Sequence, residues 1–375
     1  MKPANTARWT IALGGAALGL FCVVGIANAA TWSVASPPYT ADGSVPYAPL
    51  AQVSATSASN AWAVGRDNGS VLIEHWNGHK WAQSTLPTGP CDVFESSCQF
   101  TGVSVDPSGD AIAVGNAVLN NSGSWLPAAL AYQWTGTAWQ AMAVPSTIPY
   151  TSLDHVKAFS PTDAWAVGAG ALNGSASETA LVAQWNGTAW TQYATPFSTT
   201  LNLTMNAISG DSPSDVWIAG QATSSGYSGT RTVQSVLEHY NGSSWSQVAV
   251  PDSSGLIDVD ALSPTSVWAL AADGSVLQWN GTAWTVDTTY EIGQGAALTA
   301  VSPTDVWVAG VYVNDTLSLA NFNGALWTTA TVPAGIGEFT DAGGCALPTG
   351  AVWFAGLAWP PNGDTLPAVL ATTAG

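Results

Sequence analysis

Four titratable side chains, paired on two short segments, could support general acid–base chemistry. Asp258 and Asp260 are two residues apart, and so are His155 and Lys157. Both segments alternate polar and apolar residues as a β-strand does, so the members of each pair point to the same side. Carboxylates about 7 Å apart fall within the roughly 6.5–9.5 Å separation used by inverting glycosidases. These four residues are the candidates for a glycoside hydrolase or polysaccharide lyase site. The competing interpretation is a channel lined by solvated polar groups.

A second group of residues could bind a ligand without transforming it. Three polar segments, 116–127, 169–179 and 221–234, are expected to be long loops, and they contain Trp125, Asn173, Tyr227 and Arg231. Trp359 is expected in a further loop. Exposed aromatic side chains on firmly held loops are typical of glycan-binding and protein-binding faces. In the alternative interpretation, these aromatic rings fold back onto their own part of the protein.

The cysteines predict one disulfide and no metal site. Cys91 and Cys98 are seven residues apart in a loop segment, which suits a small disulfide staple in an exported protein. Cys345 is then unpaired and is expected to be a buried structural thiol. The Cys and His residues do not show metal-ligand spacing, and no motif indicates a cofactor.

Residues 1–29 resemble a secretory signal peptide. Lys2 and Arg8 precede an apolar run that ends in Ala27-Asn28-Ala29, a small-x-small cleavage pattern. We expect cleavage before Ala30, a single domain over 30–375, and a secreted, extracellular protein without membrane insertion. The alternative is an uncleaved anchor, because the apolar run approaches the ~18 residues that span a bilayer.

Charge excludes one class of partner. The chain has six basic and 24 acidic residues, a net charge of −18; loss of Lys2 and Arg8 leaves four basic residues and a net charge of −20. Such an acidic protein repels nucleic-acid phosphates. We therefore expect no nucleic-acid partner, and we interpret the charge as favouring solubility.

A repeat organises the rest of the chain. The segment Asp163-Ala164-Trp165-Ala166-Val167-Gly168 recurs with a central Trp, or once Ile, at positions 62, 112, 165, 217, 268, 307 and 353, which are 39–53 residues apart. This period, with short β-type runs, predicts the blades of a β-propeller. In the third repeat the expected strands are 155–159, 164–167, 180–185 and 189–194. The tryptophans are expected to fill the spaces between neighbouring blades.

Turn residues separate the expected strands. Pro161 presets a tight turn, and Asn186-Gly187 is a strong hairpin signal. The pairs Glu74-His75 and Glu238-His239 occupy matching places in the first and fourth repeats, so we interpret them as structural.

The two ends of the repeat array predict how the ring closes. The seventh repeat lacks its Trp-bearing fourth strand, and residues 31–37 around Trp32 resemble the missing piece. Pairing these segments would close a ring of seven four-stranded antiparallel blades and remove an exposed sheet edge. The sequence therefore predicts an all-β, seven-bladed propeller.

Aligning the repeats on the central Trp places one column of first-strand residues near the ring axis. The expected column is Ser54, Ser104, Lys157, Asn206, Asp260, Thr299 and Cys345, and a second level two residues earlier is Gln52, His155, Thr204 and Asp258. This polar set is expected to line the central channel.

The repeat resembles those of bacterial secreted β-propellers, and the hairpin around Trp185-Asn186-Gly187 is similar to the Asp-box turn of sialidase-type propellers. Here Asn186 stands where the Asp-box has its Asp. Sialidases hold their substrate with three arginines, whereas the mature chain has two, Arg66 and Arg231. The resemblance supports the fold and transfers no activity.

Three functions remain open from the sequence. The first is a secreted, monomeric, non-catalytic propeller that binds a glycan or a protein on its long-loop face. The second is an enzyme that uses the channel carboxylates. The third is a structural component of an envelope or matrix.

Overall fold

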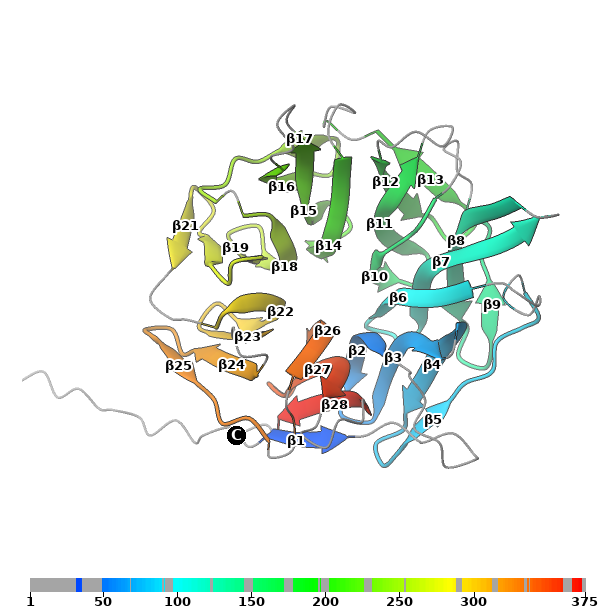
Figure 1. Ribbon diagram of the computed structural model, residues 1–375, viewed down its shortest axis with the longest axis horizontal. Helices are drawn as coiled ribbons and strands as arrows, with labels where there is room; N and C mark the ends of the chain where they lie inside the picture. The colour runs from blue at the N-terminus through cyan, green and yellow to red at the C-terminus, as the bar shows by residue number, and fades with distance from the viewer. Residues whose placement is uncertain are drawn as a thin grey trace, which may run out of the picture.

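The computed structural model describes residues 32–35, 49–67, 69–89, 91, 97–121, 124–144, 151–171, 178–194, 196, 202–225, 231–252, 254–287, 292–311, 316–333, 336, 338–359 and 366–372. Its regular elements are β-strands arranged in seven four-stranded antiparallel sheets. The sheets form the blades of a ring (Figure 1). Within these ranges no helix has the length and apolarity needed to cross a membrane. The predicted signal peptide, 1–29, lies outside the described residues.

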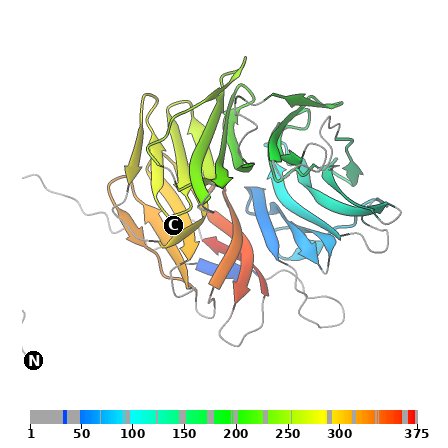
Figure 2. The same ribbon diagram turned by 45° about the horizontal axis from the view of Figure 1, so that its top comes forward.

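In each blade the first strand lies innermost, and the next three follow outward (Figures 1 and 2). Blade 1 consists of β2 (Leu50–Ser57), β3 (Asn60–Asp67), β4 (Ser70–Trp76) and β5 (Trp81–Gln83). Blade 2 consists of β6 (Ser97–Val105), β7 (Ala111–Asn121), β8 (Ser124–Trp134) and β9 (Trp139–Ala141). Blade 3 consists of β10 (His155–Ser160), β11 (Asp163–Ala171), β12 (Glu178–Trp185) and β13 (Trp190–Tyr193).

The remaining blades repeat this order. Blade 4 consists of β14 (Asn202–Ser212), β15 (Asp215–Ser225), β16 (Arg231–Tyr240) and β17 (Trp245–Gln247). Blade 5 consists of β18 (Leu256–Ser263), β19 (Ser266–Ala271), β20 (Val276–Trp279) and β21 (Trp284–Asp287). Blade 6 consists of β22 (Gln294–Ser302), β23 (Asp305–Val311), β24 (Leu317–Phe322) and β25 (Trp327–Thr329). Blade 7 consists of β26 (Glu338–Ala346), β27 (Val352–Trp359), β28 (Leu366–Thr372) and, as its outer strand, β1 (Trp32–Ala35).

The ring closes as the sequence predicts. Strand β1 pairs antiparallel with β28, with Trp32 opposite Thr372. The Trp32 ring lies 5.2 Å from the Trp307 ring of blade 6, edge to face, and 5.8 Å from the Phe354 ring of its own blade. A strand from the N-terminal part of the chain thus completes the C-terminal blade.

The central residue of each second strand, a tryptophan except for Ile112 in blade 2, joins its blade to the next one. Trp165 is fully buried, and its ring lies 4.8 Å from Tyr240 and 5.3 Å from Trp245, the two aromatic residues that flank the hairpin of blade 4. Trp62 contacts the corresponding hairpin residues of blade 2 in the same way, at 5.0 and 4.9 Å. The tryptophans therefore fill the spaces between blades, as expected.

In blades 1, 3, 4, 5 and 6 an asparagine forms the turn between the third and fourth strands through its side chain. Oδ1 of Asn186 accepts hydrogen bonds from the N–H groups of Thr188 (3.0 Å) and Ala189 (2.9 Å). Gly187 has a φ of 89°, which explains the glycine. The turn spans 186–189, because Trp185 pairs with Trp190.

The His residues of the Glu-His pairs are structural. Nε2 of His239 lies 2.5 Å from Oδ1 of Asp215, and its ring stacks 4.1 Å from the ring of Trp217. His75 makes the equivalent contacts in blade 1, 2.8 Å from Oδ1 of Asn60 and 4.4 Å from the Trp62 ring. Both side chains therefore hold the second strand and the central tryptophan of their blade.

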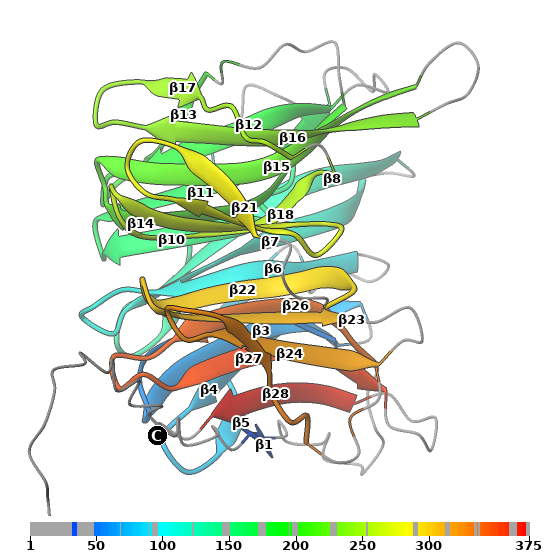
Figure 3. The same cartoon turned by 90° about the vertical axis from the view of Figure 1, so that its left-hand side faces the viewer.

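The segments predicted to be long loops are mostly β-hairpin. The pairing of β7 with β8 continues to Asn121 and Ser124, and that of β15 with β16 continues to Ser225 and Arg231. In blade 5 the equivalent pairing stops at Leu270 and Val276. Blades 2 and 4 thus carry long hairpins on the face to which their second strands run, here called the hairpin face. Figure 3 shows the β15–β16 hairpin projecting beyond its neighbours.

The predicted disulfide between Cys91 and Cys98 is present, with a Cα–Cα distance of 5.9 Å. The N–H of Cys98 donates to the carbonyl of Gly69, at the end of the β3–β4 hairpin, over 2.8 Å. The disulfide therefore fixes the start of β6 beside blade 1 on the hairpin face.

Replacing Trp32 tests the closure. We expect Trp32→Ala to lower the free energy of unfolding by about 2–4 kcal/mol, because it removes the ring that packs on Trp307 and Phe354. The exposed neighbour Ser33 supplies the control. Ser33→Ala should change the free energy of unfolding by less than about 0.5 kcal/mol. Equal melting temperatures for Trp32→Ala and the wild type would contradict this role of β1.

Glu74 makes stability depend on pH. It is 2% exposed, Oε2 has no hydrogen-bond partner, and burial raises its pKa from 4.5 to about 8. The folded state thus holds a proton that the unfolded chain releases above pH 4.5, so Glu74 favours folding at low pH and loses this contribution as pH rises through about 8.

We therefore expect the melting temperature of the wild type to fall between pH 5 and 9 more steeply than that of Glu74→Gln, because the amide does not ionise. The neutral substitution Ile73→Val, in the same strand, should shift the melting temperature equally at every pH. Parallel pH profiles for Glu74→Gln and the wild type would show that the carboxyl is not buried.

Candidate functional site

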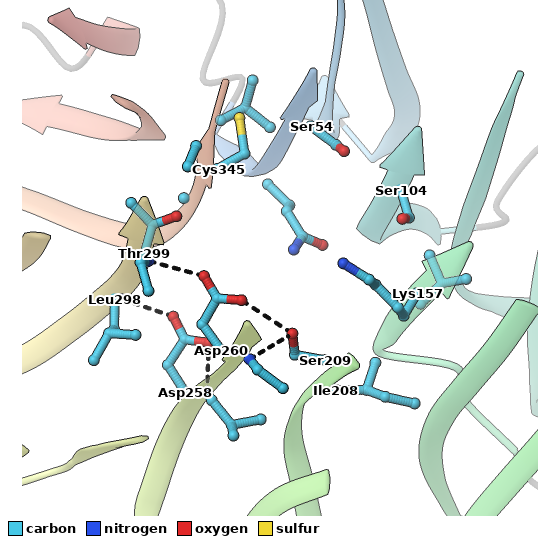
Figure 4. Close-up of a pocket in the computed structure, with 18 of the residues that line it drawn as sticks. Ser54, Ser104, Lys157, Ile208, Ser209, Asp258, Asp260, Leu298, Thr299 and Cys345 are labelled. Carbon is cyan, nitrogen blue, oxygen red and sulfur yellow. Dashed lines mark hydrogen bonds between the residues drawn. The ribbon is translucent and has the colours of Figure 1, made fainter. Parts of the chain in front are cut away.

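A cavity of about 400 Å³ occupies the central channel. First strands from all seven blades line it, and its polar or ionisable side chains are Gln52, Ser54, Ser104, Lys157, Ser209, Asp211, Asp258, Asp260, Thr299 and Cys345. Figure 4 shows several of them converging on the opening. The predicted polar channel is therefore present.

Hydrogen bonds from one blade to the next run around this channel. The Oγ of Ser54 accepts from the N–H of Val105 over 3.0 Å, and the Oγ of Ser104 accepts from the N–H of Ala158 over 3.0 Å. The first strand is the inner edge of its sheet, so half of its N–H groups lack a strand partner. At five of the seven blade junctions a side chain of the preceding blade supplies the missing acceptor. We call this set of contacts the channel belt.

The belt continues through blades 4, 5 and 7. The Oγ of Ser209 accepts from the N–H of Ala261 (3.1 Å), and Oδ2 of Asp260 accepts from that of Ala300 (2.9 Å). The thiol of Cys345 accepts from the N–H of Ala55. Two residues before Ser54 in the same strand, Oε1 of Gln52 accepts from the N–H of Val103 over 3.1 Å.

The two candidate catalytic aspartates are part of the belt. Oδ2 of Asp258 accepts from the N–H of Leu298 (2.8 Å), and its Oδ1 accepts from that of Val259 (2.8 Å). Oδ1 of Asp260 accepts from the hydroxyl of Ser209 (3.1 Å). Burial raises the pKa of Asp258 to about 7, against the lowering effect of its backbone hydrogen bonds. Both carboxylates therefore join blade 5 to blade 6, and Asp260 also joins it to blade 4.

Lys157 is brought to the same cavity, whereas His155 is not among the lining residues. Burial lowers the pKa of His155 to about 4, so the ring is neutral near pH 7. Three of the four acid–base candidates, Lys157, Asp258 and Asp260, therefore line one cavity.

Cys345 is an inert thiol. It is the free cysteine of the described residues, and burial raises its pKa to about 12. A thiolate is the reactive form, so this side chain is not a nucleophile at neutral pH. The predicted structural role fits these properties.

The expected column is wrong in blade 4. The residue opposite Trp217 is Ser209, whereas Asn206 donates from Nδ2 to the carbonyl of Leu256 (2.7 Å), and Thr204 lies opposite Gln221. In every blade eight residues separate the channel position from the central Trp or Ile, a spacing visible in the sequence. The polar alternation in β14 begins early and continues through a bulge after Met205, which makes Asn206 a false match.

The predicted ligand-binding residues are not gathered in one described place. Trp125 lies in β8, opposite Asn120, and not in a loop as expected. Arg231 is exposed at the start of β16, and Trp359 ends β27 opposite Glu338. Asn173 and Tyr227 lie outside the described residues. Among the five, Arg231 has a described, exposed side chain on the hairpin face.

A second, smaller hollow lies on the hairpin face between blades 1 and 2. It measures about 260 Å³ and is lined by segments 49–51, 65–66 and 99–101. Arg66 is its charged residue, and the neighbouring Cys98 anchors it through the disulfide. Within the described ranges, no three His, Cys, Asp or Glu side chains are grouped as metal ligands would be.

The belt assigns a structural role to Asp260 that substitution can test. Ser occupies the same level in blades 1, 2 and 4, so Asp260→Ser should keep an acceptor for the N–H of Ala300 and leave the melting temperature close to that of the wild type. Asp260→Ala removes the acceptor and should cost about 1–3 kcal/mol of unfolding free energy. Equal stability of the two variants would show that the hydrogen bond contributes nothing.

Comparison with known proteins supports the fold. No family model matches the chain, and no curated protein matches it. Among solved structures it is similar to YCF48 bound to D1 peptide (15% identity, 92% of this chain and 95% of that chain, TM-score 0.55). It is also similar to the WD40 β-propeller domain of Doa1 (11% identity, 92% and 98%, TM-score 0.52) and to a puromycin hydrolase mutant complexed with PGG (10% identity, 86% and 51%, TM-score 0.56). At these identities the likeness is one of fold: the chain is a seven-bladed β-propeller.

Proposed function

We propose that this protein is a non-catalytic binding propeller whose ligand, a protein or a glycan, docks on the hairpin face beside blades 2–4. The observation that carries the proposal is that the hairpins between the second and third strands differ in length around this face. Pairing continues to Asn121 in blade 2, to Ala171 in blade 3 and to Ser225 in blade 4, but it stops at Leu270 in blade 5. The longer hairpins form a one-sided wall next to the channel opening.

Paired strands make this wall a suitable support for recognition residues. Backbone hydrogen bonds pair the strands of this wall up to Asn121 and Ser225, and firmly paired strands lower the entropy that a ligand must overcome on binding. Arg231 offers a positive charge there on an otherwise acidic protein. The similar propeller YCF48 is described as bound to a peptide, which shows that a propeller of this size can serve such a role.

A catalytic role has weaker support. A glycosidase needs one carboxyl group to give up a proton and another to act as base or nucleophile. Here Asp258 and Asp260 accept backbone N–H groups from blade 6 on Oδ2, and their Oδ1 atoms also accept hydrogen bonds. The likeness to puromycin hydrolase covers 51% of that chain, so it carries no activity to this one.

The proposal includes export. A signal peptide at 1–29, followed by a single domain over 30–375 that acts as a monomer outside the cell, is consistent with the Cys91–Cys98 disulfide, since disulfides persist in oxidising compartments.

Shortening the blade 4 hairpin tests the proposal. Thr223 and Val233 are paired, so residues 224–232 can be replaced by an Asn-Gly turn without disturbing the ring. On glycan and peptide arrays we expect the wild type to bind a defined subset and the shortened variant to lose at least about tenfold in affinity for it.

Leu326 provides the control on the opposite face. It is 54% exposed in the turn between β24 and β25, and Leu326→Ser should leave binding unchanged. Loss of binding with Leu326→Ser but not with the shortened hairpin would place the ligand on the other face. A folded wild-type protein that binds nothing on either array would refute the proposal.

A further inference from the structure

Lys157 interrupts the channel belt at one blade junction. At the equivalent level, Ser54, Ser104, Ser209, Asp260 and Cys345 each accept an N–H from the next blade. An ammonium group has donors and no acceptor, so Lys157 cannot make this contact with blade 4. Of the seven residues at this level, Lys157 is the one whose side chain has no acceptor, since Thr299 of blade 6 also carries a hydroxyl. A residue that departs from the chemistry of its equivalents is expected where function requires it.

The position of the Lys157 ammonium is not explained by an ion pair. Among the described residues, no carboxylate oxygen lies within 4 Å of its Nζ. Its Nζ is 6.0 Å from the centre of the Phe159 ring, a distant contact. Figure 4 shows the side chain extended into the cavity, with Asp260 and Ser209 across from it. The ammonium is therefore available to a ligand.

The cavity has a donor side and an acceptor side. Ser54 and Ser104 accept their belt hydrogen bonds on Oγ, which leaves each hydroxyl hydrogen free to donate beside Lys157. On the blade 5 side, Asp258 and Asp260 use some lone pairs for belt contacts, and each carboxylate has further lone pairs. Donors thus gather on blades 1–3 and acceptors on blade 5.

Charge balance limits the class of ligand. The described lining has one cation, Lys157, and three carboxyl groups, Asp211, Asp258 and Asp260. A simple anion would be repelled by the carboxylates, and a simple cation would be repelled by Lys157. A molecule with both charges can satisfy both sides. The volume of about 400 Å³ lies within the roughly 300–1,000 Å³ of small-molecule sites.

We propose that the central channel binds a small zwitterion of the free amino-acid type, with its carboxylate on Lys157, Ser54 and Ser104 and its ammonium on Asp260 and Asp258. This site is separate from the macromolecular face proposed above. The belt residues position the ligand.

Calorimetric titration with glycine, L-alanine and L-glutamate tests the site, with acetate and methylamine as probes of each half. We expect at least one amino acid to bind the wild type more tightly than either half-probe. Lys157→Ser should weaken that binding by at least about tenfold. It also introduces the serine of blades 1, 2 and 4, so its melting temperature should equal or exceed that of the wild type.

Lys80→Ser is the matched control, because it removes the same charge from an exposed position outside the channel and should bind normally. Lys157→Met, which keeps a long apolar stem, replaces Lys157→Ser if that variant does not fold. The proposal is overturned if no amino acid binds, if acetate binds as tightly as the amino acids, or if neutralising Lys157 leaves affinity unchanged. The protein with the shortened blade 4 hairpin should still bind the amino acid, so the two proposals fail separately.

Discussion

The ring depends on one contact, in which the central residue of each second strand packs against aromatic residues of the next blade; this residue is a tryptophan in six blades and Ile112 in blade 2. A four-stranded sheet of this size cannot bury both of its faces alone. Trp165 between Tyr240 and Trp245, and Trp268 beside Phe322 and Trp327, show how each blade completes the core of its predecessor. The sequence repeats seven times because every blade needs this contact. In blade 2 the aliphatic side chain of Ile112 packs against Trp185 and Trp190.

The same requirement explains the closure by β1. Trp307 of blade 6 needs an aromatic partner in blade 7, and the described partner is Trp32 from the other end of the array. Backbone pairing of β1 with β28 places that ring correctly. Closure is therefore a packing necessity at the last junction, in addition to the protection of a sheet edge.

The fold was predictable because its determinants are local and repeated. The segment around Trp165 recurs seven times, and the Asn186-Gly187 type of turn follows it in most repeats, so blade number, strand order and the role of Trp32 follow from the sequence. The length of the hairpins did not follow, because segments such as the one around Trp125 show no clear alternation of polar and apolar residues in the sequence.

The candidate site was predictable only in part, for a different reason. The residues of the channel column lie eight positions before the central Trp or Ile of their blade. Ser209 could therefore have been found from the sequence. The hydrogen bonds of the belt could not be predicted from the sequence. Whether Ser104 or Asp258 accepts an N–H depends on how closely two blades approach each other. That distance is set by the aromatic contacts at larger radius.

The belt also shows how a structural role can leave chemistry open. A serine that accepts an N–H on Oγ keeps a hydrogen to donate, whereas an aspartate in the same position keeps lone pairs to accept. Ser104 and Asp260 hold their blades together in the same way, yet they present opposite hydrogen-bonding character to the channel. The polarity of the channel can therefore change from blade to blade while the inner strands stay in place, because the contact that fixes them uses only one of the available groups on each side chain.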